Sequence, residues 1–221
     1  MYNIVTSEHF RDICPEYVGI CIEAYVVNGP TCADLWSEIE DTVKRLRTHY
    51  TPDTIKQRPA ISAIRLAYKR AGKDPSRYRP ACEQLARRVL QGKSLYIVDS
   101  LVDLGNLVSL DSGYATAVID ADKISGEHIE LNFGKHGEPY EGIGRGVLNI
   151  ENLPVYRDEV GAFATPTSDS TRTMVSAETR HILLIINGFD GNKDNLSNAI
   201  SMSRRLLEQY VKGDVQRILY Y

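Results

Sequence analysis

Four stretches of the chain place apolar residues three or four positions apart, the spacing that puts them on one face of a helix. The first follows Thr31, which we expect to cap it, and carries Leu35 and Ile39 inward. Glycines are expected to stop the second and third helices at Gly72 and Gly92. The four predicted helices cover about residues 31–46, 60–71, 80–91 and 194–211.

Between and after these helices the pattern is typical of short strands. The stretch "GICIEAYVVN" (19–28) is almost continuously apolar, which indicates a central strand, and "HIELNF" (128–133) alternates apolar and polar residues. Further strands are predicted at 94–104, 115–124, 146–150, 154–160, 180–188 and 215–221. We therefore expect an α+β fold, with a mixed, mainly antiparallel sheet packed by helices, in a single domain over residues 1–221.

Composition and charge narrow the range of partners. The 221 residues are 43% hydrophobic and 25% charged, as in ordinary globular proteins, and the net charge of -3 gives no overall basic field. We expect no DNA partner and no stoichiometric RNA coat, although a local basic face could still touch RNA.

No apolar run approaches 18 residues, so no membrane span is predicted. The N-terminus does not resemble a signal peptide, and a cytoplasmic location is expected.

The usual motifs of metal, cofactor and nucleophile sites are missing. The four cysteines show no CxxC spacing and are expected to be reduced core thiols, and the five histidines show no HxH or HxxxH spacing. The stretch "GEPYEGIGRGVLNI" has a GxGxG pattern, but a strand is predicted after it instead of the helix that a dinucleotide site requires. No GxSxG is present. We expect no metal and no cofactor.

Two polar stretches could carry chemistry. "VDLGNLVSLDSGYATAVIDADKISG" (102–126) gathers acidic and amide side chains, either as one wall of a reactive pocket or as a run of turns that bonds its own backbone. "TPTSDSTRTMVSAET" (165–179) is rich in Ser and Thr. It is either a polar loop or a wall of hydrogen-bonding groups, with Arg172 on a ligand carboxylate or phosphate.

These pieces, in this order, carry a resemblance to a known family. "RPAISAIRLAYKRAGKDPSRYRPACEQLARRVLQGKSLYIVDSLVDLGNLVSL", then "DADKISG", "GEPYEGIG" and "VYRDEVG", resemble the free-standing B3/4-domain proteins over about residues 55–190. Those proteins are similar to the B3/4 editing domain of the phenylalanyl-tRNA synthetase beta subunit. In that domain the matching region holds an asparagine, a histidine before an aspartate, and a "DKI" run. Asn106 and Asp120 match the asparagine and the aspartate, the histidine position falls on Ala117 beside Thr116, and a glutamate of the family falls near Thr171.

The resemblance implies a cleft for the aminoacyl end of mischarged tRNA. In the synthetase, this domain hydrolyses tyrosine that is wrongly attached to the phenylalanine tRNA. Hydrolysis would use positioned hydrogen-bond donors and a held water instead of a side-chain nucleophile. The expected catalytic donors are Asn106, Thr116 and Thr171. The expected substrate-binding residues are Asp120, Gly142, Gly144, Asp169 and Arg172.

The expected partner is an aminoacyl-tRNA or a free amino acid. The aminoacylation core of a synthetase has no room in this chain, so tRNA charging is not expected. Two alternatives remain open at this point. One is a non-catalytic module that binds RNA or an amino acid, and the other is a hydrolase that acts on a different small ester or amide.

Overall fold

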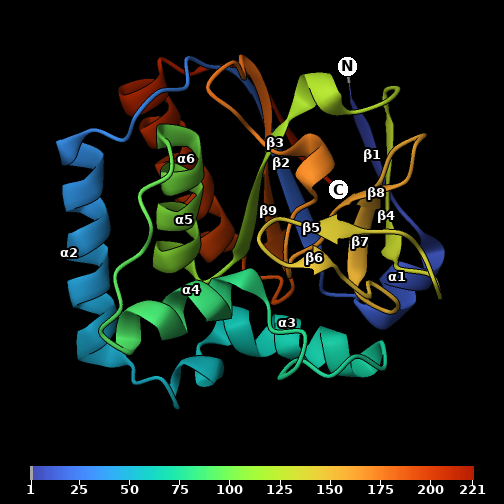
Figure 1. The fold of residues 1–221 in the computed structure, drawn as a ribbon. Coiled ribbons are helices and arrows are strands. Elements are labelled where there is room, and N and C mark those ends of the chain that lie inside the picture. The colour runs from blue at the N-terminus through green and yellow to red at the C-terminus, as the bar shows by residue number, and fades with distance from the viewer. Residues whose placement is uncertain (1) are drawn as a thin grey trace.

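Two four-stranded sheets form the frame of the protein, whose computed structural model describes residues 2–221 (Figure 1). The first sheet has the order β1-β4-β7-β8 and the second the order β10-β2-β9-β3. Paired strands are antiparallel except β1 and β4, which are parallel. The strands are β1 (Asn3–Thr6), β2 (Val18–Tyr25), β3 (Ala115–Asp120), β4 (His128–Phe133), β7 (Pro154–Arg157), β8 (Ala162–Ala164), β9 (His181–Gly188) and β10 (Asp214–Tyr220), with a small hairpin of β5 (Glu141–Gly142) and β6 (Gly146–Val147). The mixed, mainly antiparallel α+β fold expected from the sequence is confirmed.

Helices cover the second sheet on the side away from the first sheet, whereas the short helix α1 contacts β4 of the first sheet. The helices are α1 (Glu8–Ile13), α2 (Ala33–His49), α3 (Pro59–Arg70), α4 (Ala81–Leu90), α5 (Ser100–Ser112) and α6 (Lys193–Val211), with 3-10 turns η1 (Ile55–Gln57), η2 (Ala121–Lys123) and η3 (Thr171–Thr173). In Figure 1, α2, α5 and α6 stand to the left, the first sheet stands to the right, and α3 and α4 run along the lower edge. The buried apolar side chains of both sheets and of these helices form one cluster. Within residues 2–221, no helix has both the length and the apolar character needed to cross a bilayer.

The four amphipathic helices predicted from the sequence correspond to α2, α3, α4 and α6. One detail of the prediction is wrong, because Thr31 does not cap α2. The N-cap is Cys32, which makes no side-chain capping bond. The Thr31 hydroxyl instead donates to Oδ2 of Asp103 at 2.5 Å. The Thr31 hydroxyl therefore faces a buried carboxylate on a neighbouring helix and does not accept a hydrogen bond from a backbone amide of α2.

The strand predicted at 94–104 is also wrong, since α5 begins at Ser100. Asp99 caps this helix by accepting a hydrogen bond from the Val102 amide at 2.9 Å, and Gly113 ends it in the left-handed conformation with φ +82°. The stretch 102–126 is therefore a helix followed by β3 and η2, and neither a run of turns nor a cluster of acids. Asp103 and Asp111, for example, have separate partners in Thr31 and Arg45.

Two further sequence predictions hold in part. Cys14, Cys21 and Cys82 are buried free thiols, as expected of core residues, but the free thiol of Cys32 is exposed at the start of α2. The strand predicted at 146–150 shortens to β6 at Gly146–Val147, because only these two residues pair with β5.

Candidate functional site

A pocket of about 220 Å³ opens between α5, β3 and the loop that follows β8. Asn106 lines it from α5, Thr116 and Val118 line it from β3, and Asp169 lines it from the loop. Apolar side chains make up most of the remaining wall: Val98, Val102, Ile143, Met174 and Val175. We call this cavity the α5 pocket. It combines a mainly apolar wall with a few converging polar groups, the composition common to small-ligand sites.

A second, smaller cavity of about 30 Å³ adjoins the first and shares Thr116 and Asp169 with it. Tyr156 and Asn187 also line this inner cavity. The Thr165 hydroxyl, which borders it as well, is buried and has no hydrogen-bond partner within residues 2–221. The shared residues Thr116 and Asp169 therefore stand where the two cavities meet.

Asp169 has no partner for its charge. Its half-buried carboxyl makes neither a hydrogen bond nor an ion pair with any residue between 2 and 221, while its backbone carbonyl accepts a hydrogen bond from the Ile143 amide at 2.9 Å. Burial raises the pKa of this carboxyl from 3.8 to about 7. Asp169 can therefore take up or release a proton near neutral pH, as a general base must.

Asn106 and Thr116 offer unused hydrogen-bonding capacity to the same pocket. The half-buried amide of Asn106 bonds to no described residue, and the Thr116 hydroxyl reaches only its neighbour's carbonyl, that of Tyr114, at 3.5 Å. Gly105 allows α5 to approach β3 this closely, because a Cβ at this position would lie 2.8 Å from Cγ2 of Val118. The close helix–strand contact thus brings an amide donor and a hydroxyl donor to one pocket.

Gly142 and Gly144 belong to the β5–β6 turn, which lies next to the α5 pocket. Gly142 forms an antiparallel bridge with Ser170, and Gly144 is exposed with φ +68°. Between them, Ile143 lines the pocket and donates its amide to the Asp169 carbonyl. Neither glycine is itself part of the pocket wall, so the turn acts by fixing the Asp169 backbone.

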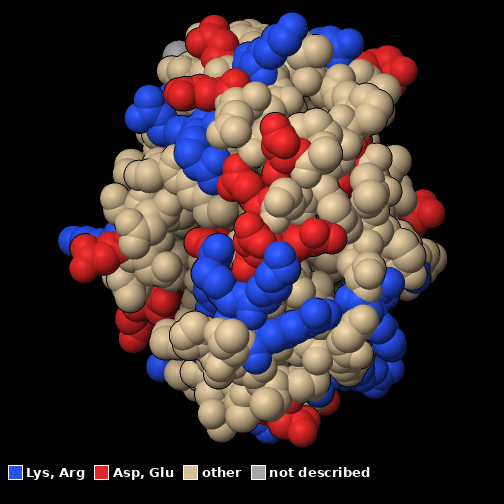
Figure 2. Space-filling model, turned by 90° about the vertical axis from the view of Figure 1, so that its left-hand side faces the viewer, with Lys and Arg blue, Asp and Glu red and all other residues tan. Residues whose placement is uncertain are grey.

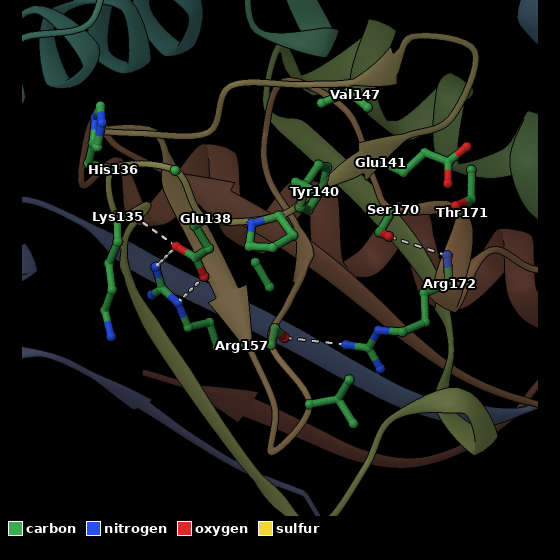
Figure 3. Close-up of a pocket in the computed structure, with 15 residues that line it drawn as sticks. Lys135, His136, Glu138, Tyr140, Glu141, Val147, Arg157, Ser170, Thr171 and Arg172 are labelled. Atoms are coloured by element: carbon green, nitrogen blue, oxygen red, sulfur yellow. Dashed lines mark hydrogen bonds and ion pairs between the residues drawn. The ribbon is translucent and has the colours of Figure 1, made fainter.

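Thr171 and Arg172 lie in a different, larger hollow of about 790 Å³, which we call the outer pocket (Figure 3). The Arg172 guanidinium is held by both carboxylate oxygens of Asp158, each at 2.9 Å. On the other side of the outer pocket, Arg157 pairs with Glu138 at 2.6 Å. Both arginines are therefore neutralised within the protein.

Asp120 lines none of these three cavities. Its buried carboxylate accepts a hydrogen bond from the Thr179 hydroxyl at 2.7 Å and lies 3.3 Å from Nζ of Lys123. The structure thus brings Asn106, Thr116 and Asp169 together, and it separates them from Asp120, Thr171 and Arg172.

No sequence motif predicted the hydrogen-bonded polar side chains beside the inner cavity. Its Tyr156 hydroxyl donates to Oδ1 of Asn187 at 2.7 Å and lies 2.8 Å from the hydroxyls of both Tyr17 and Tyr221. These residues come from four distant parts of the chain and share no motif. The described residues hold no group of three or more His, Cys, Asp or Glu side chains that could bind a metal ion.

Comparisons with known proteins identify related chains. A family model described as the B3/4 domain matches residues 63–216. Over 96 residues the chain is 32% identical to the phenylalanine–tRNA ligase beta subunit of Neisseria meningitidis serogroup A, and 31% identical to that of serogroup B. Each alignment covers 39% of this chain and 12% of the relative, so the similarity concerns a small part of those longer proteins.

A solved structure also resembles the chain. An N-terminal fragment of the phenylalanyl-tRNA synthetase beta subunit from Pyrococcus horikoshii aligns with a TM-score of 0.48 and 14% identity. The alignment covers 98% of this chain and 50% of that fragment.

Proposed function

The chain belongs to the B3/4 domain family, and on that premise we propose that it binds the aminoacyl end of mischarged aminoacyl-tRNA and hydrolyses the ester in trans. The observation that carries the proposal is the α5 pocket, where the unpartnered carboxyl of Asp169 meets the free donors of Asn106 and Thr116. The names of the relatives, both phenylalanine–tRNA ligase beta subunits, support a substrate linked to tRNA.

The proposed reaction begins with a water molecule held by Asp169. The carboxylate takes a proton from this water as its oxygen attacks the ester carbonyl carbon. Asn106 Nδ2 and Thr116 Oγ1 donate hydrogen bonds to the carbonyl oxygen as negative charge develops on it. The C–O bond to the ribose then breaks, and the departing ribose oxygen receives the proton from Asp169. The products are a free amino acid and a deacylated RNA.

This proposal changes the roles expected from the sequence. Asp169 becomes the general base instead of a residue that only holds the ligand. Arg172 is already paired with Asp158 and Asp120 with Thr179, so neither is assigned a catalytic or binding role. A cytoplasmic location and a single domain are part of the same proposal.

Single-turnover deacylation of a panel of mischarged tRNAs tests the proposal. Replacing Asp169 by Asn should slow hydrolysis by about 10²–10⁴-fold, because the amide cannot accept the proton of water. Asn106→Ala should cost on the order of a hundredfold, the usual value of one donor to a developing oxyanion. Thr171→Val is the matched control, since Thr171 is exposed on the outer pocket, and it should leave the rate within about twofold.

A non-catalytic amino-acid-binding module is the second candidate, because the wall of the α5 pocket is mainly apolar. It predicts saturable binding of a free amino acid and no deacylation above background for any member of the panel. That result would remove the hydrolase and leave the binding module.

A further inference from the structure

One short segment carries most of the uncompensated positive charge of the chain. Residues 56–93 contain 11 Lys and Arg but only two acidic residues, Asp74 and Glu83. The whole chain has 26 basic and 29 acidic residues, so the rest of it holds 15 basic against 27 acidic. The net charge of -3 therefore conceals a strongly basic segment within an acidic protein.

This segment folds into neighbouring elements on one side of the molecule. It comprises η1, α3, α4 and their connecting loops, which lie along the lower edge in Figure 1. In the view from the α2 side, Lys and Arg side chains gather in the lower half, below a group of Asp and Glu (Figure 2). We define the basic face as the partly or fully exposed Lys and Arg side chains of this segment, which are all of its basic residues except the buried Lys73: Lys56, Arg58, Arg65, Lys69, Arg70, Arg77, Arg79, Arg87, Arg88 and Lys93.

Most charges of the basic face remain available to a partner, although Arg70 pairs with Glu16 at 3.4 Å. Lys56, Lys69 and Lys93 are exposed and form no ion pair with any residue between 2 and 221. Glu83, one of the two acids of the segment, is 1% exposed and already surrounded by three arginines. Arg65 pairs with it at 2.7 Å, and Arg79 and Arg87 lie at 3.5 and 3.8 Å. One carboxylate cannot neutralise three guanidinium groups, so the face stays positive.

The basic face continues to the mouth of the α5 pocket. Arg88 lies over the ring of Tyr96 at 4.2 Å, and Tyr96 is 72% exposed two residues before Val98, which lines the pocket. On a second route, exposed Arg145 donates to Gln84 of α4, and Ile143, two residues earlier, lines the pocket. Cations and an exposed aromatic ring thus lead from α4 to the proposed reaction site.

We propose that the basic face is an RNA-docking surface. Its lysines and arginines bind backbone phosphates, and the Tyr96 ring stacks on a base of the single-stranded end whose aminoacyl group enters the α5 pocket. Charge complementarity and the exposed tyrosine beside an arginine both favour nucleic acid over an acidic protein. Only the entry of the aminoacyl group rests on the proposed function, since docking of the RNA backbone needs no hydrolysis.

Binding of bulk deacylated tRNA, measured at several salt concentrations, tests the surface. The double variant Lys69→Glu/Lys93→Glu should weaken binding by about tenfold or more at low salt and reduce the slope of log Kd against log salt by about 1.5, since each phosphate contact contributes roughly 0.7–0.9. The matched control is Lys193→Glu/Arg204→Glu, which makes the same change in net charge at exposed positions of α6. It should leave tRNA affinity within about twofold.

The tyrosine has its own test in the same assay. Tyr96→Ala should weaken tRNA binding by roughly tenfold without changing the salt slope, while Tyr96→Phe, which keeps the ring, should bind as the wild type does. A polyglutamate peptide should compete poorly with tRNA at equal charge concentration. Equal loss in the α6 control, no measurable tRNA binding by the wild type, or effective competition by polyglutamate would each overturn the RNA surface.

Failure of the surface can be told apart from failure of the proposed function. Hydrolysis of a small aminoacyl-nucleoside ester by the wild type reports on the α5 pocket alone. If this hydrolysis occurs while the Lys69/Lys93 variant binds tRNA normally, the docking surface is wrong and the hydrolase stands. If tRNA binding follows the predicted pattern but no ester is cleaved, the surface stands without the enzyme.

Discussion

Asp169 differs from the other half-buried carboxylates near the first sheet in having no partner. Asp158 and Glu138 lie 2.9 and 2.6 Å from nitrogens of Arg172 and Arg157. Burial alone would raise the pKa of both carboxyls, but the arginine hydrogen bonds, backbone hydrogen bonds and the arginine charge together outweigh it and hold each pKa below its ordinary value. Asp169 experiences burial without this compensation. Its ionisation therefore lowers the stability of the fold, which is a common cost of a reactive group.

Stability should consequently depend on pH through this residue. Because the pKa of Asp169 rises from 3.8 to about 7 on folding, the folded state binds more protons than the unfolded state between these values, and stability falls as pH rises through them. A shift of this size corresponds to about 4 kcal/mol, and water in the open pocket reduces it, so we expect Asp169→Asn to be more stable than the wild type by about 2 kcal/mol at pH 8. Urea unfolding at pH 4 and pH 8 measures this gap, which should nearly vanish at pH 4. A wild type that is the more stable protein at pH 8 would contradict the assignment.

At the scale of elements, the amphipathic helices were predictable and α5 was not. A helix with one polar face shows its period in the sequence, as α2, α3, α4 and α6 do. Helix α5 is enclosed on nearly all sides, with Leu101, Leu104 and Val108 buried together with Asp103 and Ser109. Its buried polar side chains Asp103, Ser109 and Ser112 are satisfied inside the protein, so no alternation of apolar and polar positions marks the helix. The β-branched and aromatic residues just before it, in the run 95–98, then favoured a strand.

The site was predictable only as far as local sequence could place it. The family resemblance directed attention to Asn106 and Thr116, and the structure puts both on the α5 pocket together with Asp169. Asp120 lies on the same strand as Thr116, but it is covered by Thr179 from a loop that follows η3. The sequence could not show which end of β3 stays open, because tertiary contacts decide it.

Gly105→Ala tests the close contact between α5 and β3. Alanine improves helix propensity by about 1 kcal/mol, but the new Cβ would lie 2.8 Å from a rigid valine methyl, and overpacking of this kind costs roughly 1–3 kcal/mol. We expect net destabilisation by about 1 kcal/mol, measured by urea unfolding, and a KM for a small aminoacyl ester that rises several-fold as the pocket narrows. Ser201→Ala, on the exposed face of α6, should change neither quantity by a comparable amount. A more stable variant with unchanged KM would show that the contact is loose.

At the scale of the whole molecule, the two sheets meet through a buried polar junction. Tyr156 belongs to β7 in the first sheet and Asn187 to β9 in the second, and their side chains are joined at 2.7 Å. The Asn187 amide also donates to the Ala115 carbonyl of β3 at 2.9 Å. Tyr17 and Tyr221 complete the junction. Each buried hydroxyl is satisfied by another member, which fixes how one sheet sits on the other.

Tyr156→Phe should loosen this junction at its centre. The change removes the hydroxyl that contacts Tyr17, Asn187 and Tyr221, and leaves the Tyr221 hydroxyl without this partner. We expect a loss of about 1–3 kcal/mol in the free energy of unfolding, as for other buried hydrogen-bonded groups. Tyr220→Phe, at a ring that is 62% exposed, is the control and should have almost no effect. Equal stabilities of the two variants would mean that the junction contributes nothing.

The junction also gives the protein an internal optical marker. Burial raises the pKa of Tyr17, Tyr156 and Tyr221 well above the ordinary phenol value of 10. In alkaline solution the unfolded chain releases these protons and the folded chain keeps them, so base destabilises the fold as pH climbs beyond about 10. The near-ultraviolet absorbance of phenolate from these rings can appear only once the two sheets separate. This change in ultraviolet absorbance would therefore report the separation of the two sheets without any added dye.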